Sequence, residues 1–406
     1  FLFQHRAIIS RDGRHVVFNN NAFDVIPGVI YPFFISQTYV LDVQTDVLTL
    51  LSHAGGDPNL AGNGESEPVA MSGDGRYVLF ATRATDVDIS VIDSDFEWDL
   101  VLYDLTLGSR KLITVTSDGS RTLQGIITRA MLSEDGLRVL FSTDAADVVV
   151  GQGEGAFDVF LYEHVLGRNR LLSSELGSST QPANGSSFAD AWSADGRHVL
   201  INSEATNLVS GVDDNNDNYD VFAMDIDTGQ RRILSAAPGT PNTTGNALTL
   251  GVAVSRDGSK AFLRDEFEQY LIELPSLERT PLPDQRINIL VTPDTVGKVT
   301  SAFSDDGRYL LFYADSANPP TDANEMGVDT FVYDHALKVT RLVSGSLVNE
   351  GRTGNGASAP AQLSPDGQTI LLQSDANDLA TAVDANDSTD VFVAQFVEAV
   401  FADDFD

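Results

Sequence analysis

The chain has 406 residues, of which 42% are hydrophobic, so it can bury a large core. Its 25 Lys and Arg residues against 59 Asp and Glu residues give a formal net charge of −34, which argues against a nucleic-acid partner because phosphate would be repelled. The absence of cysteine excludes disulfides and cysteine-ligated zinc, and no apolar run approaches the roughly 20 residues of a membrane-spanning helix.

A four-residue motif, Ser-x-Asp-Gly, occurs seven times, and each copy precedes an apolar run. Asp-Gly between two apolar runs predicts a hairpin, because Gly supplies the positive φ that the turn needs. We therefore interpret the seven Asp-Gly pairs as turn residues. Successive copies lie 62, 61, 60, 62, 49 and 60 residues apart, with their serines at Ser10, Ser72, Ser133, Ser193, Ser255, Ser304 and Ser364.

Each repeat contains four apolar segments that are typical of strands. In the fourth repeat they are "DAWS" before the turn, "RHVLI" after it, then "DVFAMD" and "RRILSA", which we name strands A, B, C and D. No segment has a sustained 3.6-residue apolar period, so few helices are expected. The sequence predicts an all-β, seven-bladed β-propeller with four antiparallel strands per blade in a single domain. The approximate blades are 1–62, 63–124, 125–184, 185–246, 247–296, 297–355 and 356–406.

The repeats resemble those of TolB-like and WD-repeat-like propellers, whose signature is Ser-x-Asp-Gly followed by an apolar strand. The resemblance covers essentially the whole chain and implies the propeller fold. It implies no single function, because such propellers serve as binding platforms, assembly scaffolds and accessory domains of enzymes.

Antiparallel strands place the A–B and C–D turns at one end of each blade, and the B–C loops and D–A connections at the other. The long, variable segments, such as "TRATDVDISVIDSDFEWD", all fall at the second end. Function concentrates in such loops when the scaffold is rigid, so we expect the binding face there.

Three B–C loops carry oxygen-bearing side chains at alternate positions one, three, five and seven before strand C, a spacing that suits Ca²⁺. Clustered carboxylates repel one another, and a divalent ion would remove that cost. The third-blade loop lacks ligands at positions one and five, so we expect no ion there. The twelve predicted ligands are Asp93, Asp95, Glu97 and Asp99; Asp214, Asn216, Asn218 and Asp220; and Asp384, Asn386, Ser388 and Asp390.

No catalytic motif stands out. There is no Gly-x-Ser-x-Gly elbow for a serine peptidase, and the six histidines include no closely spaced pair. His15 and His198 follow Ser-x-Asp-Gly-Arg turns and are expected to begin strand B. Trp192 is expected in the core, whereas Trp98 lies within an acidic loop. The tail "VFADDFD" loosely resembles the acidic-aromatic endings of some secreted Gram-negative proteins.

These observations favour a secreted or cell-surface bacterial propeller, extracellular or periplasmic and without enzymatic activity, whose calcium-stabilised loop face binds a protein or polysaccharide. One alternative is a structural subunit that assembles through blade edges or termini. The other is a hydrolase that acts on polysaccharide through carboxylates at the mouth of the channel.

Overall fold

The structure is a computed structural model, and all regular structure in its described residues is β-strand. The fold is a seven-bladed β-propeller, as predicted. The described residues include no helix with the length and apolarity that a membrane crossing requires. They are residues 7–31, 35–152, 156–214, 216, 218–237, 239–240, 242–245, 248–265, 269–274, 276–282, 303–315, 328–348, 352–380 and 389–395.

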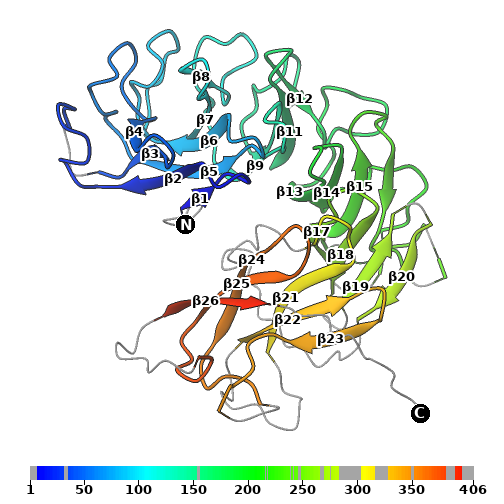
Figure 1. The fold of residues 1–406 in the computed structure, drawn as a ribbon. Coiled ribbons are helices and arrows are strands. Elements are labelled where there is room, and N and C mark those ends of the chain that lie inside the picture. Colours follow the sequence, from blue (N-terminus) through cyan, green and yellow to red (C-terminus); the bar gives the residue numbers. More distant parts are fainter. Residues whose placement is uncertain are drawn as a thin grey trace. The chain divides into compact units, whose positions relative to one another are not determined.

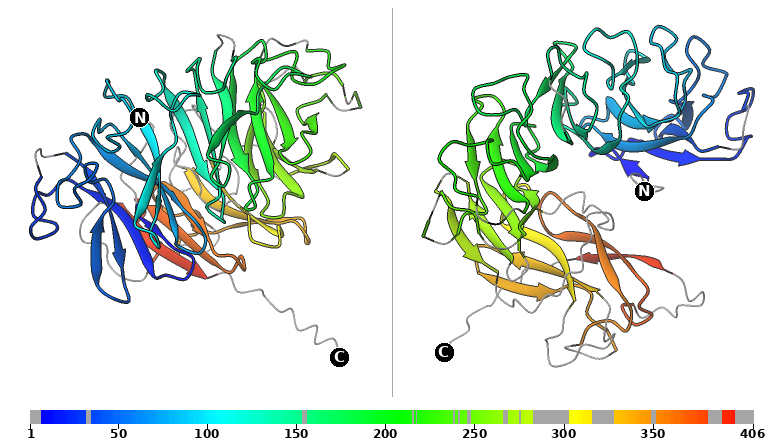
Figure 2. Two further views of the ribbon diagram at one scale, coloured as in Figure 1. Left: turned by 90° about the horizontal axis from the view of Figure 1, so that it is seen from above. Right: turned by 180° about the vertical axis from the view of Figure 1, so that it is seen from behind.

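The chain divides into two compact units, residues 1–250 and residues 251–406. Unit 1 contains blades 1 to 4, each a four-stranded sheet whose strand order follows the chain, and the four sheets run from blue to green in Figures 1 and 2. Their strands are β1 (Ile8–Ile9), β2 (His15–Asn20), β3 (Gln37–Asp42) and β4 (Val47–Leu50); β5 (Ser66–Met71), β6 (Tyr77–Thr82), β7 (Asp99–Asp104) and β8 (Ser109–Leu112); β9 (Ile127–Leu132), β10 (Arg138–Thr143), β11 (Asp158–Glu163) and β12 (Arg168–Leu171); and β13 (Ser187–Trp192), β14 (His198–Ser203), β15 (Asp220–Asp225) and β16 (Arg231–Ile233).

Unit 2 contains blades 5 to 7. Strand A of blade 6 and strand D of blade 7 are not among the described strands, so these two sheets are described with three strands each. The strands are β17 (Leu250–Val254), which begins at the unit boundary, β18 (Lys260–Arg264), β19 (Gln269–Glu273) and β20 (Glu278–Pro281); β21 (Tyr309–Asp315), β22 (Val328–Asp334) and β23 (Val339–Leu342); and β24 (Ser358–Leu363), β25 (Thr369–Ser374) and β26 (Asp390–Gln395).

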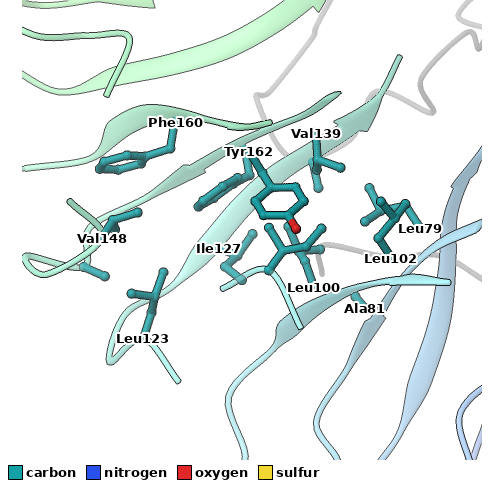
Figure 3. Close-up of a cluster of buried hydrophobic side chains, with 14 of the residues drawn as sticks. Leu79, Ala81, Leu100, Leu102, Leu123, Ile127, Val139, Val148, Phe160 and Tyr162 are labelled. Carbon is teal, nitrogen blue, oxygen red and sulfur yellow. The ribbon is translucent and has the colours of Figure 1, made fainter. Parts of the chain in front are cut away.

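The core of unit 1 lies between successive sheets. Both β6 and β7 are buried along their whole length, whereas β8 is mostly exposed. Side chains of blades 2 and 3 meet in one cluster, in which Leu79, Leu100 and Leu102 face a group that includes Phe160 and Tyr162 (Figure 3). Each such side chain stabilises the fold by roughly 1.5–3 kcal/mol on burial. Packing between the sheets therefore holds the strands in place, and with them the ends of the loops that the strands carry.

The Ser-x-Asp-Gly motifs form the A–B turns, as predicted. In all seven copies the Ser hydroxyl donates to the Asp carboxylate at 2.5–2.7 Å. The seven glycines have φ between 64° and 72°, a region that strains other residues. In blade 2, for example, the Asp74 carboxylate also accepts the N–H of Arg76 at 3.0 Å, which closes the turn.

The variable second residue of the motif links neighbouring blades, which the sequence analysis did not anticipate. The N–H of Gly73 donates to the carbonyl of Glu134 at 2.7 Å, and the N–H of Glu134 donates to the carbonyl of Ala194 at 2.9 Å. In unit 2 the N–H of Asp305 donates to the carbonyl of Pro365 at 2.8 Å. These bonds join the A–B turns of successive blades within each unit.

Candidate functional site

In blades 1 to 4 the described B–C loops and D–A connections lie at the same end of the blade, as predicted, and we call this end the loop side. After strand D the chain forms a small hairpin that pairs with the B–C loop of its own blade, as in the parallel bridge between Ile92 and Arg121. The same hairpin reaches the next blade, where the N–H of Ser117 donates to the carbonyl of Asp147 at 2.8 Å. The loop side is therefore a connected network and not a set of independent loops.

A buried aspartate lies at the start of strand C in several blades and contacts a hydroxyl two residues beyond strand D. In blade 2 the Thr114 hydroxyl donates to the Asp99 carboxylate at 2.5 Å and accepts the N–H of Leu100 at 3.0 Å. The same pairs in other blades are Asp158 with Ser173, Asp220 with Ser235 and Asp329 with Ser344, at 2.6–2.9 Å. Since blade 3 has this pair without the alternating acidic pattern, the aspartate at the seventh loop position has a structural role that does not depend on a metal.

Burial makes these aspartates costly to ionise. It raises the pKa of Asp158 and of Asp220 to about 6, and the hydroxyl hydrogen bond opposes the shift only in part. Burial raises the pKa of Asp99 well above its ordinary value, and the charges of Asp93 and Asp95 raise it further. These electrostatic interactions show that the acidic side chains of the second-blade loop act on one another.

Positions one and three of the second-blade loop turn toward the D–A hairpin. The Asp93 carboxylate accepts the N–H of Asp95 and the Thr122 hydroxyl, both at 3.3 Å. The Asp95 carboxylate accepts the side-chain amide of Gln124. Burial raises the pKa of Asp93, and the charge of Asp95 adds to the shift. Two half-buried carboxylates thus lie beside the buried Asp99, with a hairpin hydroxyl next to them.

The fourth-blade loop repeats this arrangement. The Asp214 carboxylate accepts the N–H of Asn216 at 3.1 Å and the Thr244 hydroxyl at 3.4 Å. The Asn216 amide donates to the carbonyl of Gly245 at 2.6 Å. Asp214 also raises the pKa of Asp220. The first loop position therefore makes the same threonine contact in both blades, and the third position contacts the D–A hairpin in both, as an acceptor in blade 2 and as a donor in blade 4.

Position five does not take part in these contacts. Glu97 and Asn218 are exposed, and the Asn218 side chain turns back to the carbonyl of Asn216 at 3.1 Å. In blade 3 the Gln152 side chain bonds the backbone of its own loop, including the carbonyl of Ala145 at 2.8 Å. In the seventh-blade loop, Asp384, Asn386 and Ser388 lie outside the described residues, and Asp390 begins β26.

The oxygen atoms of blades 2 and 4 suit a hard cation in kind, because carboxylate, amide and hydroxyl oxygens are calcium ligands. In the part of the chain that the structure describes, no three His, Asp or Glu side chains group as a metal site by themselves. An ion in either loop would thus depend also on other oxygen atoms: in blade 2 on the Thr122 hydroxyl, in blade 4 on Asn216 and the Thr244 hydroxyl, and in both on backbone carbonyls. Calcium stays a prediction on these grounds.

A second recurring contact lies just beyond the ladder of strands B and C, and we call it the rim pair: the residue after strand B with the residue before strand C. In blade 2 the Arg83 guanidinium lies 5.8 Å from the centre of the Trp98 ring. In blade 7 the Thr389 hydroxyl donates to Asp375 at 2.6 Å. In blade 4 the pair is Glu204 and Tyr219, and Glu204 contributes to the raised pKa of Tyr219, of which burial is the largest cause.

The remaining single residues have structural positions. His15 and His198 are the first residues of β2 and β14, as predicted. Trp192, in β13, packs against the core between blades 3 and 4, also as predicted. Trp98 packs partly against the core of blades 2 and 3, in addition to its contact with Arg83.

A shallow depression of about 390 Å³ lies at the opposite end of blades 3 and 4, among their turns. Both of its arginines engage the same carboxylate of the lining, since Arg138 donates to Asp227 at 2.8 Å and Nε of Arg197 lies 3.8 Å from Asp227.

No protein-family model matches the chain, and neither does any curated protein. Solved structures do match it. Dipeptidyl peptidase 4 of Porphyromonas gingivalis matches with a TM-score of 0.52 and 10% identity, over 91% of this chain and 49% of that chain. A prolyl endopeptidase matches with a TM-score of 0.53 and 11% identity, over 97% and 50%. TolB from Acinetobacter baumannii matches with a TM-score of 0.38 and 14% identity, over 75% and 58%.

The shared feature is the propeller fold. At these identities the likeness shows the fold alone, and the chain spans about half the length of the two peptidases and 58% of TolB. The sheets of the structure itself confirm the propeller fold that the resemblance to TolB-like and WD-repeat-like propellers implies.

Proposed function

We propose that the chain is a non-enzymatic propeller scaffold whose loop side is stabilised by calcium and binds another macromolecule. The observation that carries the calcium proposal is the repeated arrangement in blades 2 and 4. In each, the first, third and seventh loop positions interact beside a threonine of the D–A hairpin. We propose Asp93, Asp95 and Asp99 as ligands in blade 2, and Asp214, Asn216 and Asp220 in blade 4.

Calcium would have two stabilising effects on the loop side. It would balance carboxylates whose ionisation is opposed by burial and by mutual repulsion. It would also join the B–C loop to the D–A hairpin through the neighbouring threonine, and so brace the face that we propose for binding. The large acidic excess supports a bacterial extracellular or periplasmic location, where calcium is plentiful.

The test is thermal unfolding of the whole chain with excess chelator and with millimolar CaCl₂. We expect calcium to raise the melting temperature, because an ion that binds only the folded state stabilises it by mass action. Asp95→Asn combined with Asn216→Ala should remove most of the shift. The matched control Asp24→Asn removes an exposed acid from the first-blade loop and should retain it.

An unchanged melting curve, together with no calcium retained after dialysis, would contradict the calcium proposal. Magnesium serves as the second control, since its smaller octahedral shell fits flexible, many-oxygen loops less well. A shift of equal size with magnesium at the same concentration would indicate general screening of charge instead of a site.

A further inference from the structure

Three aromatic side chains form a strip on the loop side of blades 3 and 4, which we call the aromatic strip. Phe157 precedes strand C of blade 3, Phe188 lies in β13, and Tyr219 precedes strand C of blade 4. The centre of the Phe188 ring is 5.1 Å from that of Phe157 and 5.9 Å from that of Tyr219. All three are half-buried, so ring surface remains accessible.

The backbone holds the strip in place. The N–H of Ser187 donates to the carbonyl of Phe157 at 2.7 Å, which fixes the start of β13 against the end of the third-blade loop. Strands B and C of blade 4 pair in register up to Ser203 and Asp220. Glu204 and Tyr219 are the next residues on either side, so this rim pair lies directly above the ladder.

Blade 2 shows what the same rim position can do. Its ladder ends at Thr82 and Asp99, and the next residues, Arg83 and Trp98, form a cation–π contact. In blade 2, therefore, the chain supplies its own guanidinium to the aromatic ring at the rim.

Blades 3 and 4 carry a carboxylate where blade 2 carries Arg83. In blade 3 the ladder ends at Thr143 and Asp158, so Asp144 and Phe157 occupy the rim positions, and the Asp144 carboxylate also accepts the N–H of Ile126 at 2.6 Å. Both Asp144 and Glu204 are exposed. The strip thus combines accessible aromatic faces with exposed acids, the two groups that favour a guanidinium.

We propose that the aromatic strip binds an arginine side chain of a partner protein segment, with the guanidinium on the rings and paired with Glu204 or Asp144. This inference rests on the proposed function and specifies its partner. A planar guanidinium fits better than an ammonium, because it stacks on a ring and bonds a carboxylate through two donors. The net charge of −34 would also attract a basic segment over a long range.

The experiment uses a fluorescein-labelled peptide, Gly-Arg-Gly-Arg-Gly amide, titrated with the whole chain at 150 mM NaCl and followed by fluorescence anisotropy. Two matched peptides replace arginine by citrulline, which keeps the shape without the charge, or by lysine. We expect the citrulline peptide to bind at least tenfold more weakly, and the lysine peptide to bind several-fold more weakly than the arginine peptide.

Two variants locate the site. Glu204→Gln and Phe188→Leu should each weaken binding of the arginine peptide by roughly five- to tenfold. The matched control Glu278→Gln removes an exposed acid from the start of β20 and should change binding less than twofold. Melting curves of all variants check the fold, and Glu204→Gln remains informative if Phe188→Leu is unstable.

Several results would overturn the proposal: no binding of the arginine peptide, equal binding of the citrulline peptide, or an equal loss with Glu278→Gln, which would indicate diffuse attraction. Displacement of the peptide by a neutral oligosaccharide such as cellohexaose, with the same sensitivity to Phe188→Leu, would make the strip a sugar site instead. The calcium-dependent melting shift is measured separately, so failure at the strip and failure of the calcium proposal are distinguishable.

Discussion

Strand C of blades 2 and 4 begins and ends with aspartate, and the two ends balance that charge in opposite ways. At the end of β7, Asp104 accepts Nη2 of Arg76 at 2.6 Å and two backbone N–H groups. At its start, Asp99 accepts one hydroxyl, from Thr114. No ion pair joins Asp99 or Asp220 to a basic side chain among the described residues.

The pKa values follow the same division. The Arg197 guanidinium lowers the pKa of Asp225, at the end of β15, far below its ordinary range. Burial raises the pKa of Asp220, at the start of the same strand, to about 6. At the turn ends of β7 and β15 the chain's own arginines thus balance the aspartate. At the loop ends of the same strands, Asp99 and Asp220 have no such partner among the described residues, although Arg121 and Asp147 form an ion pair elsewhere on the loop side.

The largest expected effect comes from removing an arginine on the turn side. Arg76→Met should lower the free energy of unfolding by about 2–3 kcal/mol, because it leaves the buried Asp104 without its charged donor. Urea titration measures the loss. The matched control Arg168→Met removes an exposed arginine 3.5 Å from Glu163 and should cost less than about 0.5 kcal/mol. Equal losses of stability would show that an arginine bonded to a buried aspartate contributes no more than an exposed arginine.

A smaller effect is expected from pH in calcium-free buffer. Asp158 and Asp220 have pKa values of about 6 when folded, against about 3.9 in the unfolded chain, so the folded state binds protons first. The free energy of unfolding should therefore rise as pH falls from 7 to about 4.5, by up to ~2 kcal/mol for each group. Below about pH 4 the aspartates with lowered pKa, such as Asp225, begin to be protonated and lose their ion pairs with arginine. The free energy of unfolding should then fall.

The double variant Asp158→Asn, Asp220→Asn isolates this effect, since asparagine can still accept the hydroxyl hydrogen bond. Between pH 7 and pH 5 its stability should change less than that of the unmodified chain, and the raised pKa values of Asp99 and Asp93 account for the part that remains. A slope equal to that of the unmodified chain would show that other groups cause the dependence.

The repeat made the fold readable from sequence. Seven Ser-x-Asp-Gly motifs specify the turn, its flanking strands and the end of the blade at which each loop lies, because every part of that chemistry is local. The buried pairs of an aspartate in strand C with a hydroxyl just after strand D could also have been predicted, because the two residues recur 15 residues apart, for example Asp99 and Thr114. The alternating spacing indicated only a calcium ligand for Asp99 and Asp220.

The details of the candidate site depend on contacts between distant segments. Thr122 lies 29 residues after Asp93, and only the packing of the D–A hairpin brings them together. Equal spacing predicted equal roles for positions one, three, five and seven, but the backbone turns Glu97 outward. The rim pairs depend on the residue at which the pairing of strands B and C ends. The alternation of apolar and polar residues in the sequence does not specify that residue.

The smallest expected effect sharpens the assignment of positions within the loop. Glu97→Gln should change the calcium dissociation constant less than twofold, because the side chain is exposed and outside the cluster. Asp95→Asn should weaken binding more than tenfold, since it removes a charged oxygen beside Asp93 and Asp99. Isothermal titration calorimetry measures both. Equal losses would restore the four-position ligand set that the spacing suggests.

The most direct test of the account is the number of protons released when calcium binds. At pH 6 a carboxyl group with a pKa of about 6, such as that of Asp220, is about half protonated, and a divalent ion would displace that proton. Calorimetric titration in two buffers of different ionisation enthalpy should show calcium binding that releases about half a proton for the fourth-blade site at pH 6, and almost none at pH 8. Absence of calcium binding, or binding without proton release at pH 6, would contradict the claim that the buried aspartates of the loop side are held for a cation.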